Sequence, residues 1–237
     1  MKKFTTQKQF NSVAKKTSYA LCSLTCVAFF CAINPALAQL GTAKQIKYAE
    51  APAEKINFLA DYKKDLDAIE NYLNNIKNLS AKFVQKSSGG LVEGKFYLSR
   101  PGKMRVEYAD QPKILIVVNG SVLSYKDLEL DEVSNIGTNT TPASFLTRPN
   151  ISFSAKDVEV TSVIKTTESI TVSVIKKNRT EAGEFSLTFK TSPALGFAKM
   201  EVKNDLGEKT TVSLREVNFP ESLSDNLFVI RNTNLPF

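Results

Sequence analysis

The sequence contains no histidine and no tryptophan, and its three cysteines are Cys22, Cys26 and Cys31, all near the N-terminus. Without histidine, the chain lacks the commonest general base at neutral pH and a usual zinc ligand. No glycine-rich loop of the phosphate-binding type follows a strand pattern and opens a helix. These absences exclude the usual histidine- or cysteine-based catalytic sites, the usual zinc sites and the common nucleotide-binding loop.

Carboxylates remain as a catalytic resource. Glu129, Asp131 and Glu132 stand close together after an alternating pattern. Paired carboxylates can act as the acid and base of a glycosidase, but this position is typical of a solvated strand edge, which is the interpretation we favour. We therefore expect a binding protein and not an enzyme, with no cofactor and no metal.

The N-terminal segment has the composition of an export signal. Five lysines come without an acid, and residues 19–33 form an apolar run shorter than the ~20 residues of a spanning helix. The small-x-small box at residues 36–38 follows at the right distance. We expect a signal peptide over residues 1–38, cleaved after Ala38, and a periplasmic protein; a membrane anchor is the alternative.

Removal of residues 1–38 would also remove every cysteine, so the stability of the remaining chain would rest on packing alone. The whole chain carries 31 Lys+Arg against 24 Asp+Glu, and the signal contains five of these lysines and no acid. The rest is nearly balanced in charge, and no nucleic-acid partner is expected.

Residues 39–51 are polar without periodicity and are interpreted as a disordered lead-in, and residues 52–237 as a single domain. Pro52 suits the first turn of a helix. From there apolar residues recur at spacings of three and four, which predicts one amphipathic helix of up to about 24 residues. A coiled coil is the less favoured reading of the same spacing. The apolar positions are Leu59, Tyr62, Leu66, Ile69, Leu73 and Ile76.

After Asn78 the apolar period changes to two, and short turns separate about eleven predicted strands. Connections this short cannot support parallel crossovers, and a large twisted sheet curls. We therefore predict a mainly β protein: an unclosed antiparallel β-barrel capped by the N-terminal helix and a short helical lid. One predicted strand has Val158, Val160, Ser162 and Ile164 on one face, and the last covers Leu227–Ile230.

The lid is predicted over Thr140–Asn150. Thr141 suits an N-cap, Pro142 suits the first helical position, and Pro149 ends the helix. This insert carries Phe145 and Leu146, which we expect to cover one side of the curled sheet. A surface connector is the alternative.

An arginine stands where the strand pattern calls for an apolar residue. Alternation sets Phe96, Leu98 and Arg100 on one face of a strand, and after a Pro-Gly turn it sets Met104 and Val106 on one face of the next. An inward guanidinium needs polar partners, from a closing segment or a ligand headgroup, unless it reaches the rim. The predicted cavity is lined by Phe96, Leu98, Met104, Val106, Phe145 and Leu146.

Several motifs in this chain resemble those of the LolA family, the periplasmic carriers of outer-membrane lipoproteins. The resemblance covers about Asp61 to Arg231. It rests on Phe83-Val84-Gln85, Gly94, the run from Arg100-Pro101-Gly102 to Tyr108, Pro112, Asn119-Gly120, Leu195-Gly196-Phe197, Asp205-Leu206-Gly207 and Leu227–Ile230.

The resemblance implies an unclosed barrel whose apolar cavity takes the acyl chains of a lipoprotein. Arg100 would hydrogen-bond to the lid and hold the empty cavity shut, and Met104 would help to receive cargo from an inner-membrane lipoprotein-releasing transporter. Acylated lipoproteins, that transporter and an outer-membrane acceptor are the implied partners, and a monomer is expected.

Two other roles fit a similar half-barrel. One is an envelope-stress sensor that detects lipoproteins and acts on an anti-sigma regulator. Such proteins usually add a second domain, whereas the matching region nearly fills the chain expected after removal of residues 1–38. The other is an outer-membrane receptor, which is normally lipidated, whereas no lipid-attachment box precedes Cys22, Cys26 or Cys31.

Overall fold

The structure is a computed structural model that describes residues 57–110, 113–177 and 183–230. The predicted signal peptide, the lead-in over residues 39–51, Pro52 and Pro112 lie outside these residues. They stay predictions.

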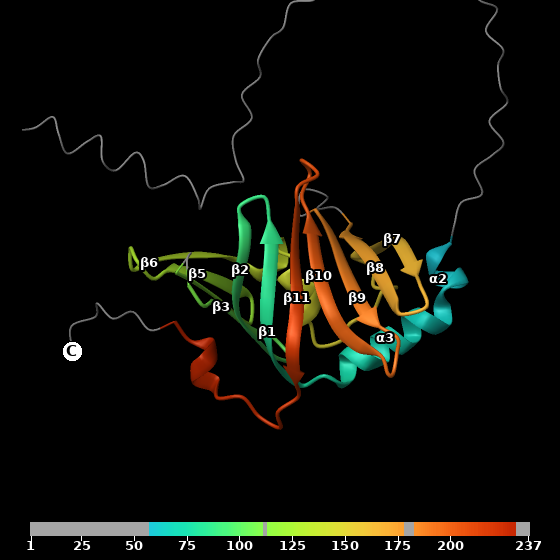
Figure 1. The fold of residues 1–237 in the computed structure, drawn as a ribbon, viewed down its shortest axis with the longest axis horizontal. Coiled ribbons are helices and arrows are strands. Elements are labelled where there is room, and N and C mark those ends of the chain that lie inside the picture. Colours follow the sequence, from blue (N-terminus) through green and yellow to red (C-terminus); the bar gives the residue numbers. More distant parts are fainter. Residues whose placement is uncertain (1–56, 111–112, 178–182, 231–237) are drawn as a thin grey trace, which may run out of the picture. The chain divides into compact units, whose positions relative to one another are not determined.

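Eleven antiparallel strands form one sheet in the order β6-β5-β4-β3-β2-β1-β11-β10-β9-β8-β7. Two meanders meet where β1 pairs with β11, and the edge strands β6 and β7 do not pair with each other, so the barrel is unclosed as predicted. Figure 1 shows these two edges at opposite sides of the view. The strands are β1 (Asn78–Ser87), β2 (Gly90–Ser99), β3 (Lys103–Tyr108), β4 (Ile114–Asn119), β5 (Val122–Asp127), β6 (Glu132–Gly137), β7 (Val158–Lys165), β8 (Ser169–Lys176), β9 (Glu184–Lys190), β10 (Gly196–Lys203) and β11 (Lys209–Asn218).

The predicted N-terminal helix is present as two pieces, α2 (Phe58–Asp61) and α3 (Lys63–Asn75). Tyr62 separates them with φ −114° and ψ 21°, away from helical values. The break changes the direction of the apolar stripe. Leu59 is therefore 41% exposed, against the prediction, whereas Leu66, Ile69 and Leu73 are buried on α3.

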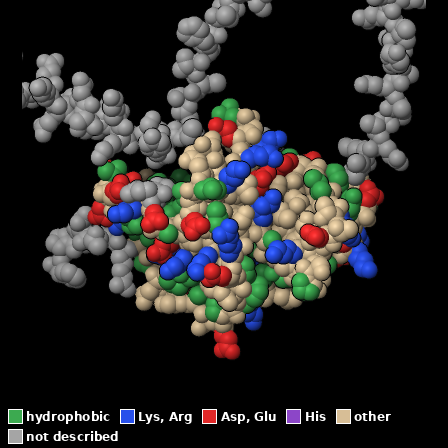
Figure 2. Space-filling view, viewed as in Figure 1, with side chains coloured by type: hydrophobic (Ala, Val, Ile, Leu, Met, Phe, Trp, Pro, Cys, Tyr) green, Lys and Arg blue, Asp and Glu red, His purple; other side chains and the backbone are tan. Residues whose placement is uncertain are grey.

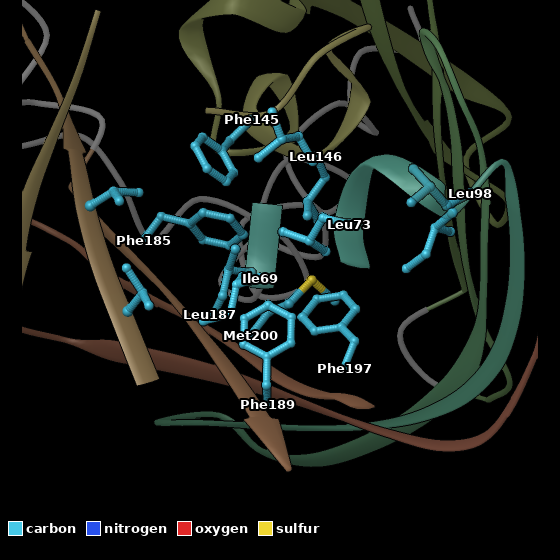
Figure 3. Close-up of a cluster of buried hydrophobic side chains, with 14 of the residues drawn as sticks. Ile69, Leu73, Leu98, Phe145, Leu146, Phe185, Leu187, Phe189, Phe197 and Met200 are labelled. Carbon is cyan, nitrogen blue, oxygen red and sulfur yellow. The ribbon is translucent and has the colours of Figure 1, made fainter. Parts of the chain in front are cut away.

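Helix α3 lies against the concave side of the sheet. Figure 3 shows Ile69 and Leu73 between Phe145 and Leu146 on one side and Phe189, Phe197 and Met200 on the other. The hydroxyl of Tyr72 on α3 accepts a 3.0 Å hydrogen bond from the Phe197 backbone N–H. The helix thus fills the part of the concave side under β8, β9 and β10.

The predicted face of β7 is wrong beyond its middle. The register with β8 shifts between Val160 and Ser162, so Val163 becomes buried and Ile164 is 59% exposed. A β-bulge adds one residue to a strand and exchanges its two faces. Alternation in the sequence does not show where such a residue is inserted.

The predicted last strand at Leu227–Ile230 is also wrong: the segment contains the 3₁₀ helix η3 (Asp225–Phe228) and no strand. Phe228 is 1% exposed and packs with Leu115 and Val117 of β4. The Arg105 guanidinium donates to the Leu227 carbonyl at 3.0 Å. The segment covers the outer side of β4, and its backbone bonds to side chains instead of to another strand.

Figure 2 shows Lys and Arg side chains interspersed with Asp and Glu over the side formed by β1, β11 and β10. Within residues 57–110, 113–177 and 183–230, no helix has both the length and the apolar character needed to cross a membrane.

Candidate functional site

An apolar cavity of about 260 Å³ lies on the concave side, in the part that α3 does not fill. Strands from both meanders form its wall, and α4 (Ala143–Thr147) with the two residues before it covers it. The lining residues are Phe83, Gln85, Phe96, Met104, Val106, Tyr108, Ile116, Leu123, Thr141, Pro142, Ala143, Leu146, Phe185, Met200, Val202, Thr210 and Val212.

Four of the six predicted cavity residues line this space: Phe96, Met104, Val106 and Leu146. Leu98 is 3% exposed and belongs to the main core without reaching the cavity. Phe145 also lies behind the wall, with its ring 5.7 Å from that of Phe153 and 6.2 Å from that of Phe185. It lines a separate pocket of about 40 Å³.

The prediction missed most of the residues that line the cavity, because it considered only two strands and the helical insert. Met200 and Val202 on β10, and Ile116 on β4, continue the same alternation of apolar residues. Applying that rule to every strand would have identified them. Which inner positions face the cavity and which face α3 depends on where the helix crosses the sheet.

Helix α4 occupies the predicted lid segment and starts one residue later than expected. Thr141 does not cap this helix. The Thr141 hydroxyl instead donates a 2.9 Å hydrogen bond to the carbonyl of Thr138, in the 3₁₀ helix η1 (Thr138–Thr140). Phe145, Leu146 and Thr147 are all buried. This packing suits a cover over the sheet better than a surface connector.

Arg100 has the polar partners that its inward position requires, and they come from two segments. One Nη donates to the Leu73 carbonyl at the end of α3. The other donates to Asn74 Oδ1 at 3.1 Å, to the Arg148 carbonyl at 2.8 Å and to the Pro149 carbonyl at 3.3 Å. The C-terminus of a helix carries partial negative charge, which favours the guanidinium there.

Two further side chains of α3 hold the segment that follows α4. Asn74 donates to the Ile151 carbonyl at 2.9 Å and accepts from the Ile151 N–H at 2.8 Å. Glu70 Oε1 accepts from the Phe153 N–H at 2.6 Å and from the Ser152 hydroxyl at 3.1 Å. The sequence pattern predicted only the apolar positions of this helix and assigned no role to Glu70 or Asn74.

We call the side chains of Glu70, Asn74 and Arg100, with the backbone of residues 148–153, the latch. Burial lowers the pKa of the Arg100 guanidinium from its ordinary value, which still leaves it charged at neutral pH because that value lies far above 7. The latch joins α3, the end of β2 and the segment after α4 by hydrogen bonds that water could replace if the segment moved.

The cavity wall contains one titratable group, the phenol of Tyr108, which donates a 2.8 Å hydrogen bond to Gln85 Oε1. Burial raises the pKa of Tyr108. Among the described residues, no group of three or more metal-binding side chains occurs. The cavity can therefore enclose an apolar ligand, and it offers little for acid–base chemistry.

Tyrosine titration should report this burial. The chain has seven tyrosines, and we expect Tyr108 and Tyr125 to ionise at higher pH than a free tyrosine, because burial raises the pKa of both. Since the neutral phenol is favoured in the folded protein, stability should be retained below about pH 10 and fall as pH rises above it. The ultraviolet absorbance of phenolate measures the titration, and Tyr108→Phe should remove one late-ionising group. An unchanged late phase in that variant would contradict the assignment.

Comparison with known proteins adds to this geometry. The family model described as "Outer membrane lipoprotein carrier protein LolA" matches residues 74–231. No curated protein matches the chain.

Solved structures with a similar arrangement share little sequence with the chain. A LolA superfamily protein from Nitrosomonas europaea is 10% identical, with 70% of this chain and 97% of that one covered and a TM-score of 0.40. Lipoprotein LppX from Mycobacterium tuberculosis is 11% identical, with 70% and 98% covered and a TM-score of 0.35. MucB in the MucA/MucB complex from Pseudomonas aeruginosa is 13% identical, with 69% and 59% covered and a TM-score of 0.39.

The family model, in contrast, covers more than half of the chain and includes all eleven strands, α4 and every residue that lines the cavity. The residues that line the cavity thus all fall within the match, and the chain belongs to the LolA family of outer membrane lipoprotein carrier proteins.

Proposed function

We propose that this protein is a periplasmic chaperone that encloses the acyl chains of lipoproteins and carries them from an inner-membrane transporter to the outer membrane. The observation that carries the proposal is an apolar cavity covered by α4, with the latch tying the segment after α4 to α3. Membership of the LolA family supports the same role. The predicted signal peptide over residues 1–38 would direct the chain to the periplasm.

Hydrophobic transfer gives the physical reason for a carrier. Each acyl CH₂ removed from water contributes about 0.8 kcal/mol, so a lipid anchor does not cross an aqueous compartment unaided. The cavity of about 260 Å³ is smaller than the roughly 300–1,000 Å³ of typical ligand sites. We take this structure as the closed form of the proposed cycle, in which α4 would move aside to admit a lipid anchor.

Arg100 is the proposed control of that movement. In the closed form its hydrogen bonds join α3 to the segment after α4. Entry of cargo would separate these groups, and the free energy lost from the latch would offset part of the free energy gained from acyl burial. Such a balance between two states permits both uptake and release. Met104 lies in the cavity wall, where it would contact arriving acyl chains.

Native mass spectrometry with lipid extraction tests the carrier role directly. We expect protein purified from cells that produce a lipoprotein to retain a bound lipoprotein, and depletion of the protein to leave lipoproteins at the inner membrane. The alternative is an envelope-stress sensor with the same half-barrel. For a sensor, depletion should change transcription and leave lipoprotein sorting intact.

Filling the cavity should abolish acyl binding without unfolding the protein. Val106→Trp places a large side chain into open space beside Met104, so it should cost little stability. Val84→Trp is the matched control, because Val84 lies between two cavity residues on β1 and faces the other side of the sheet. Displacement of a fluorescent fatty acid measures binding. Full binding by Val106→Trp would show that acyl chains enter elsewhere.

A further inference from the structure

A hydrogen-bonded pair of polar side chains lies in the mostly apolar wall of the cavity. The Tyr108 hydroxyl on β3 donates to Gln85 Oε1 on β1 across the intervening strand β2, and both residues line the cavity. Burying polar groups in an apolar wall has a cost unless they are hydrogen-bonded. Acyl packing alone needs no polar group here, so the pair suits a ligand that also has a polar part.

The backbone is built to bring the two side chains together. Gly94 of β2 stands directly opposite both Phe83 of β1 and Tyr108 of β3. A Cβ on Gly94 would lie 2.6 Å from the Phe83 ring. With no side chain there, the rings of Phe83 and Tyr108 meet edge to face at 5.5 Å between centroids, and the phenol reaches Gln85.

This arrangement orients the Gln85 amide. Its oxygen is occupied by the Tyr108 hydroxyl, which leaves the two amide N–H groups as donors. Within the part of the chain that the structure describes, no protein atom accepts from the Gln85 amide nitrogen. No side-chain nitrogen or oxygen shut off from solvent lacks a partner there, so this nitrogen is not fully buried, and Gln85 itself lines the cavity.

We propose that the Gln85 amide donates a hydrogen bond to an acyl ester carbonyl of the bound lipid, and that Tyr108 positions it. An ester carbonyl accepts hydrogen bonds but donates none, so it matches a free N–H and gains nothing from the hydrocarbon wall. This inference rests on the proposed function and adds to it: the cavity would recognise the ester end of the acyl chains as well as their length.

The test compares ester and ether linkages. The probes are a cysteine peptide carrying an ester-linked diacylglyceryl group, the same peptide with ether-linked chains, and phosphatidylglycerol. The ether peptide keeps the hydrocarbon and lacks the carbonyl. We expect the protein to bind the ester peptide about 3- to 10-fold more tightly than the ether peptide, as for one net hydrogen bond. A similar preference for the peptide over phosphatidylglycerol would identify a lipoprotein anchor, rather than a phospholipid, as the source of the ester.

The double variant Gln85→Met/Tyr108→Phe keeps the shape of both side chains and removes the polar groups. It should bind the two peptides equally, with the affinity for the ether peptide unchanged. Tyr97→Phe is the control, because Tyr97 packs with the cluster on the outer side of β4. Equal binding of both peptides by the unmodified protein would overturn the inference and leave the carrier role intact. Binding of neither peptide would overturn both.

Discussion

Replacing Arg100 with leucine should leave the protein folded, lower its free energy of unfolding by about 2–3 kcal/mol, and slow the release of bound acyl ligand. The sheet and the core around α3 do not depend on the guanidinium. The stability loss follows from hydrogen bonds to a charged group, each worth about 1.5–3 kcal/mol, reduced here because Arg100 is half-buried.

The slower release has a separate cause. If the cover moves as proposed, the bonds from Arg100 to the carbonyls of Arg148 and Pro149 form only while the cover is shut. Removing them raises the free energy of the empty closed form, whereas the loaded form has already given them up. If the free energy of the empty closed form rises by about 1.4 kcal/mol, the equilibrium ratio of loaded to empty protein increases tenfold.

Hydrogen exchange and ligand dissociation measure the two effects. In Arg100→Leu, the amides of Ile151 and Phe153, which donate to Asn74 and Glu70, should exchange faster because the latch has lost one of its three side chains. Arg105→Leu is the matched control: that guanidinium contacts Glu107 and the Leu227 carbonyl on the outer side of the sheet. It should lower stability without changing release. If Arg100→Leu released ligand at the normal rate, Arg100 would be a structural residue only.

Replacing Gly94 with alanine should strongly destabilise the protein. A Cβ at this position would lie 2.2 Å from the Glu107 carbonyl and 2.6 Å from the Phe83 ring. The carbonyl belongs to the paired strand β3, so the backbone must separate to make room. Overpacking commonly costs about 1–3 kcal/mol, and a clash with backbone on a central strand should reach or exceed the upper end.

Gly89→Ala provides the comparison for Gly94→Ala. Gly89 lies in the β1–β2 turn, and its nearest atom to a new Cβ is Ser87 Oγ at 3.6 Å, an ordinary contact. Thermal unfolding should show a normal Tm for Gly89→Ala and a fall of at least roughly 6 °C for Gly94→Ala. Equal melting temperatures would mean that β2 and β3 can separate at little cost in free energy. The missing side chain at Gly94 would then not explain the close packing of Phe83 on Tyr108.

The candidate site was predictable where local pattern decides which way a side chain faces. Phe96, Met104 and Leu146 were placed in the cavity from strand alternation and a proline-bounded insert, and the structure has them there. The inward direction of Arg100 and its need for polar partners followed from the same alternation. Its partners did not, because Leu73, Arg148 and Pro149 contribute carbonyl oxygens, which every residue has.

Period-two alternation and short turns are local properties of the chain, so the sequence alone predicts an antiparallel sheet of about eleven strands in an unclosed barrel. The strand that it predicts at Leu227–Ile230 is not one of the eleven observed. Which apolar residues line the cavity and which lie behind its wall depends on tertiary packing, as Leu98 and Phe145 show. The tertiary structure also decided the bulge in β7 and the packing of Phe228 on the outer side of β4. These features depend on contacts between residues far apart in the chain, and hydrophobic burial has no direction that a single segment could encode.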